Sequence, residues 1–113
     1  MNTAASTLEI TSFRTRPGVD EERLRAAVAR SNLWLGRCPG FLARHLGREP
    51  STGLWREVIE WKDHDSAAAA AAEFGQADET QDFLACIDFD APETGMAHVD
   101  LLADYEAEVA LAR

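Results

Sequence analysis

The chain has 113 residues, which is enough for one domain with one hydrophobic core. Its hydrophobic fraction of 46% and charged fraction of 27% are ordinary for globular proteins and exclude a disordered chain. Eleven basic against twenty acidic residues give a net charge of −9, which repels phosphate backbones and anionic headgroups and so disfavours nucleic-acid and membrane-surface binding.

The first half of the chain predicts a strand and a helix. The strand runs from Leu8 to Thr15, a segment rich in β-branched and aromatic residues. After Pro17-Gly18 a helix begins with Asp20 as its N-cap and two glutamates at the positive end of the helix dipole. Proline and glycine at 39–40 end it. Its buried stripe is predicted from the helical spacing of Leu24, Ala27, Val28, Ser31 and Leu35.

A hairpin and a second helix follow. The hairpin pairs a strand from Phe41 to Arg48 with one from Leu54 to Lys62, and residues 49–53 between them have turn chemistry. Either Asp63 or Asp65 caps the next helix, which opens with six alanines at 67–72 and is interrupted at Gly75.

The last third predicts a short helix and a final strand. Asp78 and Gln81 have the spacing of a capping box, which opens a helix extending through Ile87. A polar loop then leads to a strand from about Met96 to Tyr105. Residues 106–113 are expected to fray or to pack on a partner.

The order strand, helix, strand, strand, helix, strand is that of a ferredoxin-like split βαβ domain (βαββαβ) of the α+β class with an antiparallel sheet. A right-handed crossover through the first helix is expected to make the first and third strands parallel neighbours, with the helices on one face. No linker or repeat interrupts the chain, so residues 1–113 are predicted to form one domain with its core at about 8–105.

Both faces of the predicted sheet are apolar. In the third strand Trp55, Ile59 and Trp61 point to one face, and Leu54 and Val58 point to the other. The helices suffice for one face only, and the remaining patch would exceed the roughly 300–600 Å² found on monomers. We therefore expect a homodimer that packs sheet to sheet.

Several segments resemble a known family. They are Arg16-Pro17-Gly18, Cys38-Pro39-Gly40-Phe41, the run from Trp55 to Trp61-Lys62-Asp63, Phe83 to Ile87-Asp88, and Met96-Ala97-His98. Together they resemble the antibiotic-biosynthesis-monooxygenase-like (ABM) domains of the dimeric α/β-barrel superfamily, over roughly residues 8 to 105. The resemblance implies a dimeric α/β barrel. For activity it implies a cofactor-independent monooxygenase that acts on a small aromatic phenol, quinol or polyketide-type substrate.

The haem-degrading branch of this family has a recognisable set of residues. It needs an Asn on the first strand, a Trp in the second helix and a ligating His on the next helix. Here these positions fall at Thr11, near Ala70 and near Gln81 to Phe83. None of the three residue types matches, so haem degradation is not expected.

His98 is the first candidate catalytic residue, because an imidazole titrates near neutral pH and Asp100 on the same strand face could orient it. The alternative is a histidine held at a strand end or in the dimer interface. His45, predicted on the same side as Phe41 and Ala43, lines a ligand cavity if that side faces the helices and is structural if it faces the partner. Asn32 either donates to a substrate carbonyl or is exposed.

The substrate-binding candidates are mainly aromatic. Three tryptophans could frame a flat substrate or simply fill the core: Trp34, Trp55 and Trp61. Tyr105 could supply a phenol hydroxyl. Arg44 either holds an anion or pairs with a glutamate of the neighbouring strand, Glu57 or Glu60. His64, beside two aspartates at a helix start, is interpreted as solvated.

Other signals are missing from the sequence. It has no Gly-rich phosphate loop, nucleophile elbow or Cys/His cluster, so no cofactor or metal is predicted. The first seven residues do not have the pattern of a signal peptide, so we expect a cytoplasmic protein. In that compartment Cys38 and Cys86 are expected to be reduced and partly buried.

Three functions therefore stay open at the level of sequence. The first is the cofactor-independent monooxygenase. The second is a non-catalytic ligand-binding or stress-response protein, or a cyclase-like biosynthetic helper. The third is an interaction domain, which a closed interior without a cavity would favour.

Overall fold

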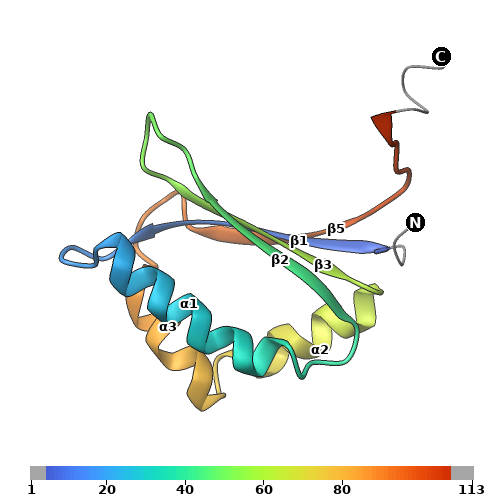
Figure 1. Ribbon diagram of the computed structural model, residues 1–113, viewed down its shortest axis with the longest axis horizontal. Helices are drawn as coiled ribbons and strands as arrows, with labels where there is room; N and C mark the ends of the chain where they lie inside the picture. Colours follow the sequence, from blue (N-terminus) through green and yellow to red (C-terminus); the bar gives the residue numbers. More distant parts are fainter. Residues whose placement is uncertain (1–4, 108–113) are drawn as a thin grey trace.

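A sheet forms one layer of the molecule, and the helices between residues 21 and 86 cover one of its faces (Figure 1). The computed structural model describes residues 5–107. Its elements are β1 (Thr7–Thr15), α1 (Glu21–Leu35), β2 (Phe41–Arg48), β3 (Trp55–Trp61), α2 (His64–Phe74), a 3₁₀ turn (Asp78–Thr80), α3 (Gln81–Cys86), β4 (Ile87–Asp88) and β5 (Gly95–Asp100). The predicted α+β, ferredoxin-like fold is confirmed.

The strands lie in the order β2, β3, β1, and the outer edge of β1 is shared by β4 and β5. β1 and β3 are neighbours as predicted, but they are antiparallel, with Thr7 opposite Trp61 and Phe13 opposite Trp55. The predicted parallel pairing was wrong. α1 returns the chain so that β2 runs in the direction of β1, and the hairpin turn then reverses the chain once more.

The local signals for the two longer helices are confirmed. The Asp20 carboxylate accepts a hydrogen bond from the Arg23 amide at 2.8 Å and caps α1. Asp63 caps α2 in the same way through the Ser66 amide at 2.8 Å, which decides between the two aspartates proposed for this cap. The five residues of the predicted stripe on α1 are its buried residues.

The C-terminal third departs from the prediction. No side-chain cap forms at Asp78. Instead, the side-chain amide of Gln81 donates through its Nε2 to the backbone carbonyls of Gly75 and Ala77. Ile87 belongs to β4, not to the preceding helix. β5 ends at Asp100 because its partner β1 begins at Thr7, directly opposite. Of the end predicted to fray or to pack on a partner, residues 108–113 lie outside the described residues.

The face of the sheet that meets the helices holds the core, in two clusters. One cluster joins β1, α1 and α3 around Phe13, Leu24 and Phe83. The other joins β3 and α2, where Trp61 and Ala67 are almost fully buried. The alanine run of α2 allows this helix to lie close to the sheet, because a methyl group keeps the backbones near each other.

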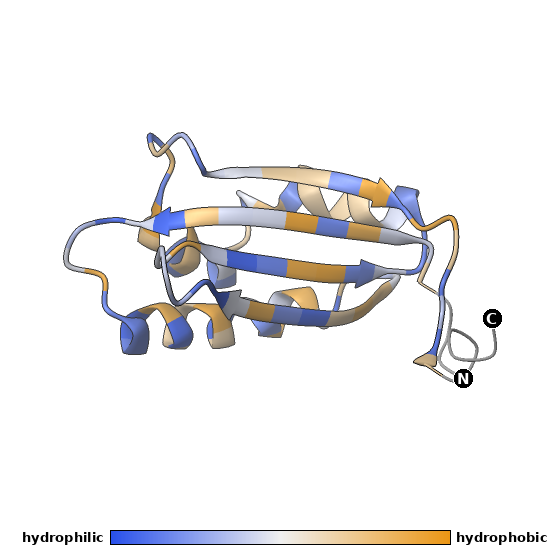
Figure 2. Ribbon diagram, turned by 90° about the horizontal axis from the view of Figure 1, so that it is seen from above, coloured by the Kyte–Doolittle hydropathy of each residue, from blue (hydrophilic) through white to orange (hydrophobic). Residues whose placement is uncertain are grey.

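The outer face of the sheet carries an apolar centre with a polar rim. Figure 2 looks onto this face and shows hydrophobic and hydrophilic residues alternating along the strands. The strand registers place Leu8, Ile10 and Val58 together on it, beside Val99, which is 41% exposed. Leu54, predicted to share this face, is instead buried ahead of β3.

Candidate functional site

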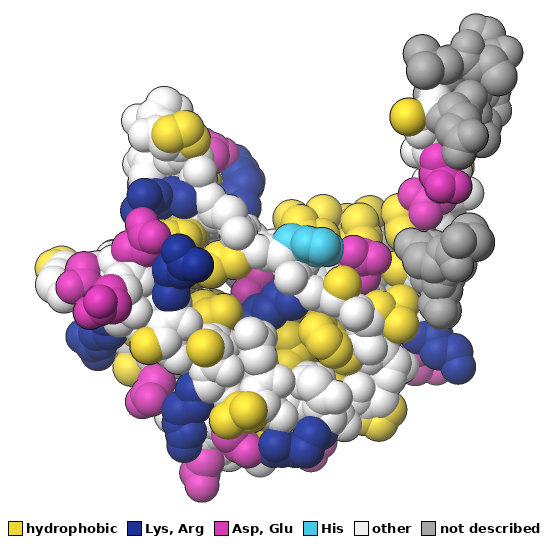
Figure 3. All heavy atoms as spheres, viewed as in Figure 1, with side chains coloured by type: hydrophobic (Ala, Val, Ile, Leu, Met, Phe, Trp, Pro, Cys, Tyr) yellow, Lys and Arg dark blue, Asp and Glu magenta, His cyan; other side chains and the backbone are white. Residues whose placement is uncertain are grey.

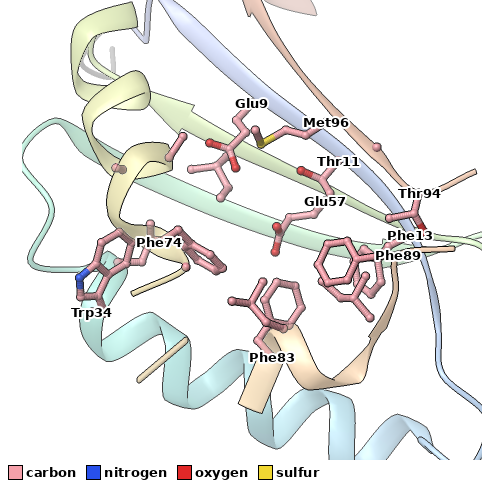
Figure 4. Close-up of a pocket in the computed structure, with 18 of the residues that line it drawn as sticks. Glu9, Thr11, Phe13, Trp34, Glu57, Phe74, Phe83, Phe89, Thr94 and Met96 are labelled. Carbon is pink, nitrogen blue, oxygen red and sulfur yellow. The ribbon is translucent and has the colours of Figure 1, made fainter. Parts of the chain in front are cut away.

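A cavity of about 350 Å³ lies between the inner face of the sheet and the helices (Figure 4). This size is within the range of roughly 300–1,000 Å³ that small-molecule sites occupy. Most of its wall is apolar, and six of its side chains are aromatic: Phe13, Trp34, Trp61, Phe74, Phe83 and Phe89. Figure 3 shows hydrophobic side chains along the seam between sheet and helices, where the interior reaches the surface.

Two carboxyl groups enter this apolar cavity, from Glu9 on β1 and Glu57 on β3. Both point inward because alternate residues of a strand share a face, and their neighbours on that face are Phe13 and Ile59. In Figure 4 both side chains reach into the space between sheet and helices.

Glu57 forms a buried ion pair with Arg44 of β2. Its Oε2 accepts from Arg44 Nε at 2.6 Å, and the two side chains are only 4% and 6% exposed. Arg44 is held on its other side by α1, since its Nη1 donates at 2.7 Å to both the Ser31 hydroxyl and the Asn32 side-chain oxygen. Its guanidinium carbon lies 5.2 Å from the centre of the Phe83 ring.

Two properties of this pair matter for chemistry. Burial raises the pKa of the Glu57 carboxyl, Arg44 opposes that rise, and the nearby Glu9 adds to it. Arg44 Nη2 is the one buried side-chain nitrogen or oxygen among the described residues without a hydrogen-bond partner. Glu57 is therefore a carboxyl group that holds a proton more strongly than usual, beside a guanidinium with an unused donor.

Glu9 has different neighbours. Its Oε1 accepts from the Trp61 indole N–H at 3.3 Å and lies 3.3 Å from His98 Nε2. The Glu9 side chain is 13% exposed and that of His98 18% exposed. The His98 ring packs edge to face on His64, which is exposed. This group of side chains connects the cavity wall to the protein surface.

Of the predicted tryptophans, Trp34 and Trp61 line the cavity. Trp55 lies outside the cavity wall. Its ring stacks on Phe13 with ring centres 6.3 Å apart, and the Arg48 guanidinium lies over the Trp55 ring. Arg44 pairs with Glu57, one of the two partners proposed for it across the hairpin.

None of the predicted catalytic residues lines the cavity. His98 contacts the Oε1 atom of Glu9. Asp100, which was proposed to orient this histidine, is exposed. Asn32 supports Arg44 from α1. Tyr105 follows β5 on the C-terminal segment and is 62% exposed.

His45 lies on the outer face of the sheet, where its Nε2 is 2.7 Å from the Glu60 carboxylate. A register shift between Phe41 and Ala43 separates it from Phe41, which packs inward on Trp61. The prediction that Phe41 and His45 share a side was wrong, because the shift inserts one residue into the alternation.

Glu9 and Glu57 were not predicted as site residues. The signal was present for Glu57, since it alternates with Trp55 and Ile59 and so shares their buried face. The positions tested for haem degradation do lie at this site, because Thr11, Ala70 and Phe83 all line the cavity.

Within residues 5–107 no group of three or more His, Cys, Asp or Glu side chains could hold a metal ion. No helix in the described part of the chain is long and apolar enough to cross a membrane. Cys38 and Cys86 are free and at least partly buried as predicted, and burial raises the pKa of both thiols.

No protein-family model matches the sequence, and no curated protein matches it. Solved structures match the fold. SnoaB from Streptomyces nogalater, described as a cofactor-independent oxygenase, aligns with a TM-score of 0.65 at 20% identity over 92% of this chain and 98% of that one. A Bordetella bronchiseptica protein whose name assigns it to the antibiotic biosynthesis monooxygenases has a TM-score of 0.65 at 21% identity, over 88% and 100%.

A conserved protein from Methanosarcina mazei has a TM-score of 0.61 at 13% identity, over 85% of this chain and 93% of that one. The architecture and cavity define an α+β, ferredoxin-like domain with room for a ligand. The fold is that of the antibiotic biosynthesis monooxygenase (ABM) domain proteins, as the resemblance predicted. At these identities the likeness shows the fold and leaves the activity open.

Proposed function

We propose that this protein is a cofactor-independent monooxygenase of small hydroxylated aromatic compounds, with Glu57 as its general base. The observation that carries the proposal is a buried carboxyl group of raised pKa on the wall of an apolar, aromatic cavity. Perturbed carboxyl groups in such surroundings are typical of catalytic acids and bases.

The wall of the cavity suits a flat substrate. Phe74 and Phe83 approach each other edge to face with ring centres 6.1 Å apart, and Trp34 packs on Phe74 at 5.5 Å. Such rings can pack against an aromatic ligand both face to face and edge to face. The volume of about 350 Å³ fits a compound of a few fused rings.

The chemistry proceeds from a phenol with a reactive C–H position. Glu57 accepts the hydroxyl proton, and the resulting phenolate passes one electron to O₂. The resulting aryloxyl radical and superoxide combine to form a C–O bond at the reactive ring carbon, and the peroxide takes the proton back from Glu57 and becomes a hydroperoxide. Loss of water then leaves a quinone. One oxygen atom of O₂ enters the product, the other leaves as water, and the substrate supplies all four electrons.

Arg44 and its supports have a positioning role in this proposal. The 2.6 Å contact fixes the Glu57 carboxylate, and Ser31 and Asn32 fix the guanidinium. Arg44 does not line the cavity, so its guanidinium acts on a substrate only through the Glu57 carboxyl group that it holds. Asn32 thereby acts through Arg44, and His98 acts through Glu9.

A homodimer is part of the proposal. The apolar centre of the outer sheet face and the exposed side chains of Val99 and Leu102 favour coverage by a second copy. The segment that follows β5 leaves the sheet on this side (Figure 1). Mass measurement in dilute solution tests it, and a monomer at micromolar concentration contradicts it.

The test of the activity is oxygen uptake with anthrone-type and hydroquinone substrates. Glu57→Gln should lower the rate by roughly 10²–10⁴-fold, the usual contribution of a general base. The control is Glu60→Gln, which removes the same charge from the same strand on the outer face. A rate that survives Glu57→Gln but is lost in His98→Gln assigns the base to His98, and no uptake by the folded dimer contradicts the activity.

Ligand binding without turnover is the second candidate. The Arg44–Glu57 ion pair favours it, because a carboxylate already compensated by a guanidinium is a weaker base. A bound aromatic compound that is never consumed would support this function, in a stress-response protein or a cyclase-like helper.

A further inference from the structure

The charged side chains on the cavity wall are all acidic. Apart from Glu9 and Glu57, the side chains with N–H or O–H groups that line it are the hydroxyls of Thr11 and Thr94 and the indoles of Trp34 and Trp61. No lysine, arginine or histidine is among the lining residues of the part of the chain that the structure describes. The charged groups that a ligand meets on this wall are therefore both carboxyl groups.

The two carboxyl groups are compensated differently. Glu57 is paired with Arg44 behind the wall. Glu9 receives the indole N–H of Trp61 and a contact from His98, and both use Oε1. Its Oε2 takes no hydrogen bond from the described residues, so Glu9 retains an acceptor for a ligand.

The sheet register fixes the spacing of these acceptors. Glu9 lies opposite Ile59 and Glu57 opposite Thr11, so the two glutamates are diagonal neighbours on adjacent strands. Diagonal positions have Cα atoms roughly 7–8 Å apart. Hydroxyl groups on two different rings of a fused-ring compound can therefore reach one carboxyl group each.

We propose that Glu9 is the specificity-determining residue of the cavity, and that with Glu57 it selects an uncharged aromatic ligand with two hydrogen-bond donors and rejects aromatic carboxylates. This inference rests on the proposed function, since it assigns the ligand of the same cavity. A ligand carboxylate beside Glu9 is repelled strongly because the surrounding wall is apolar and screens charge poorly. A hydroxyl group in the same place donates to Glu9 instead.

The experiment compares two probes by titration calorimetry at neutral pH. 2,6-Dihydroxynaphthalene carries a donor on each ring, and 6-hydroxy-2-naphthoic acid replaces one hydroxyl by a carboxylate. The wild-type protein should bind the diol at least about tenfold more tightly. Glu9→Gln keeps the shape and the acceptor for Trp61 but removes the charge, and should reduce that preference to about threefold or less.

Glu60→Gln is the matched control, because it removes one glutamate charge from the outer face and should leave the preference unchanged. Thermal melting confirms that each variant is folded. A wild-type preference below about threefold overturns the inference, as does an absence of binding by both probes. A preference that Glu9→Gln leaves intact, or that Glu60→Gln reduces equally, also overturns it.

Binding and turnover separate this inference from the proposed function. Selection of the diol without oxygen uptake by any hydroxylated aromatic supports the role of Glu9 and contradicts the monooxygenase. Oxygen uptake with no preference between the probes supports the monooxygenase and contradicts the role of Glu9.

Discussion

Arg44 and Glu57 are joined at 2.6 Å across the β2–β3 hairpin, and both side chains are more than nine-tenths buried. The pair lies between the helix layer and the cavity, so the same contact belongs to the core and to the proposed site. A buried ion pair gives little net stability, but a lone buried charge is strongly destabilising. This asymmetry makes stability and activity separable by mutation.

Arg44→Met is expected to lower the free energy of unfolding by about 3–5 kcal/mol, because Glu57 is left buried without its partner. The double variant with Met at 44 and Leu at 57 should recover most of that loss. Urea unfolding measures both. Arg56→Ala, at an exposed ion pair with Glu49, is the control and should cost at most about 1 kcal/mol. A double variant no more stable than Arg44→Met would show that the lost stability does not come from the unpaired Glu57 charge. A double variant that regains stability but takes up no oxygen would show that the ion pair is needed for activity.

The raised pKa of Glu57 predicts a pH dependence of stability. The folded state holds the Glu57 proton more strongly than the unfolded chain, whose carboxyl has the ordinary value of 4.5. The resulting stabilisation is fully present below that pH and is lost as the pH rises from there through the folded-state pKa. Urea unfolding of the wild type and Glu57→Gln between pH 4 and pH 7 should show the wild type losing stability relative to the variant. A constant difference across this range would mean that the pKa of Glu57 is unchanged by folding.

The fold was predictable because its signals are local. Asp20 caps a helix through an amide three residues away, and the α1 stripe follows from spacing alone. The turn between β2 and β3 is similarly encoded by five neighbouring residues. Signals of this range are independent of how the sheet is assembled.

The site depends on longer-range relations. The cavity exists because α2 and α3 meet β1 and β3, and no segment encodes that meeting by itself. Alternation counted from Phe41 wrongly grouped His45 with Phe41 on one face, because the register shift at Phe41/Ala43 reverses the faces beyond it. Glu57 alternates with Trp55 and Ile59, so the sequence places it on a buried face. A glutamate on a buried face can be recognised as a site residue only when its ion-pair partner, Arg44, is known.

The choice of Asp63 as the cap of α2 gives a third prediction. Asp63→Ala removes the acceptor of the Ser66 amide and should lower Tm by about 5 °C. Hydrogen bonds from Ser66 lower the pKa of the Asp63 carboxyl, so this contribution is present above its ordinary value of 3.8 and is lost as the pH falls through the lowered pKa. Asp65→Ala in the first turn of the same helix is the control. Equal Tm values for the two variants would contradict the assignment of the cap.

Gly40, directly before β2, gives the last prediction. Its backbone φ is +83°, and an added Cβ would lie 2.2 Å from Ser66 Oγ and 2.5 Å from Ser66 Cβ. Gly18 has a similar φ of +88° with open space around it, so Gly18→Ala pays only the backbone strain of about 1–2 kcal/mol. Gly40→Ala should cost about 1–3 kcal/mol more, because the clash forces the start of α2 away from the strand. Urea unfolding measures both variants, and combining Gly40→Ala with Ser66→Gly should recover the excess. If the two alanine variants are equally stable, the close approach of α2 to β2 at Ser66 does not exist in solution.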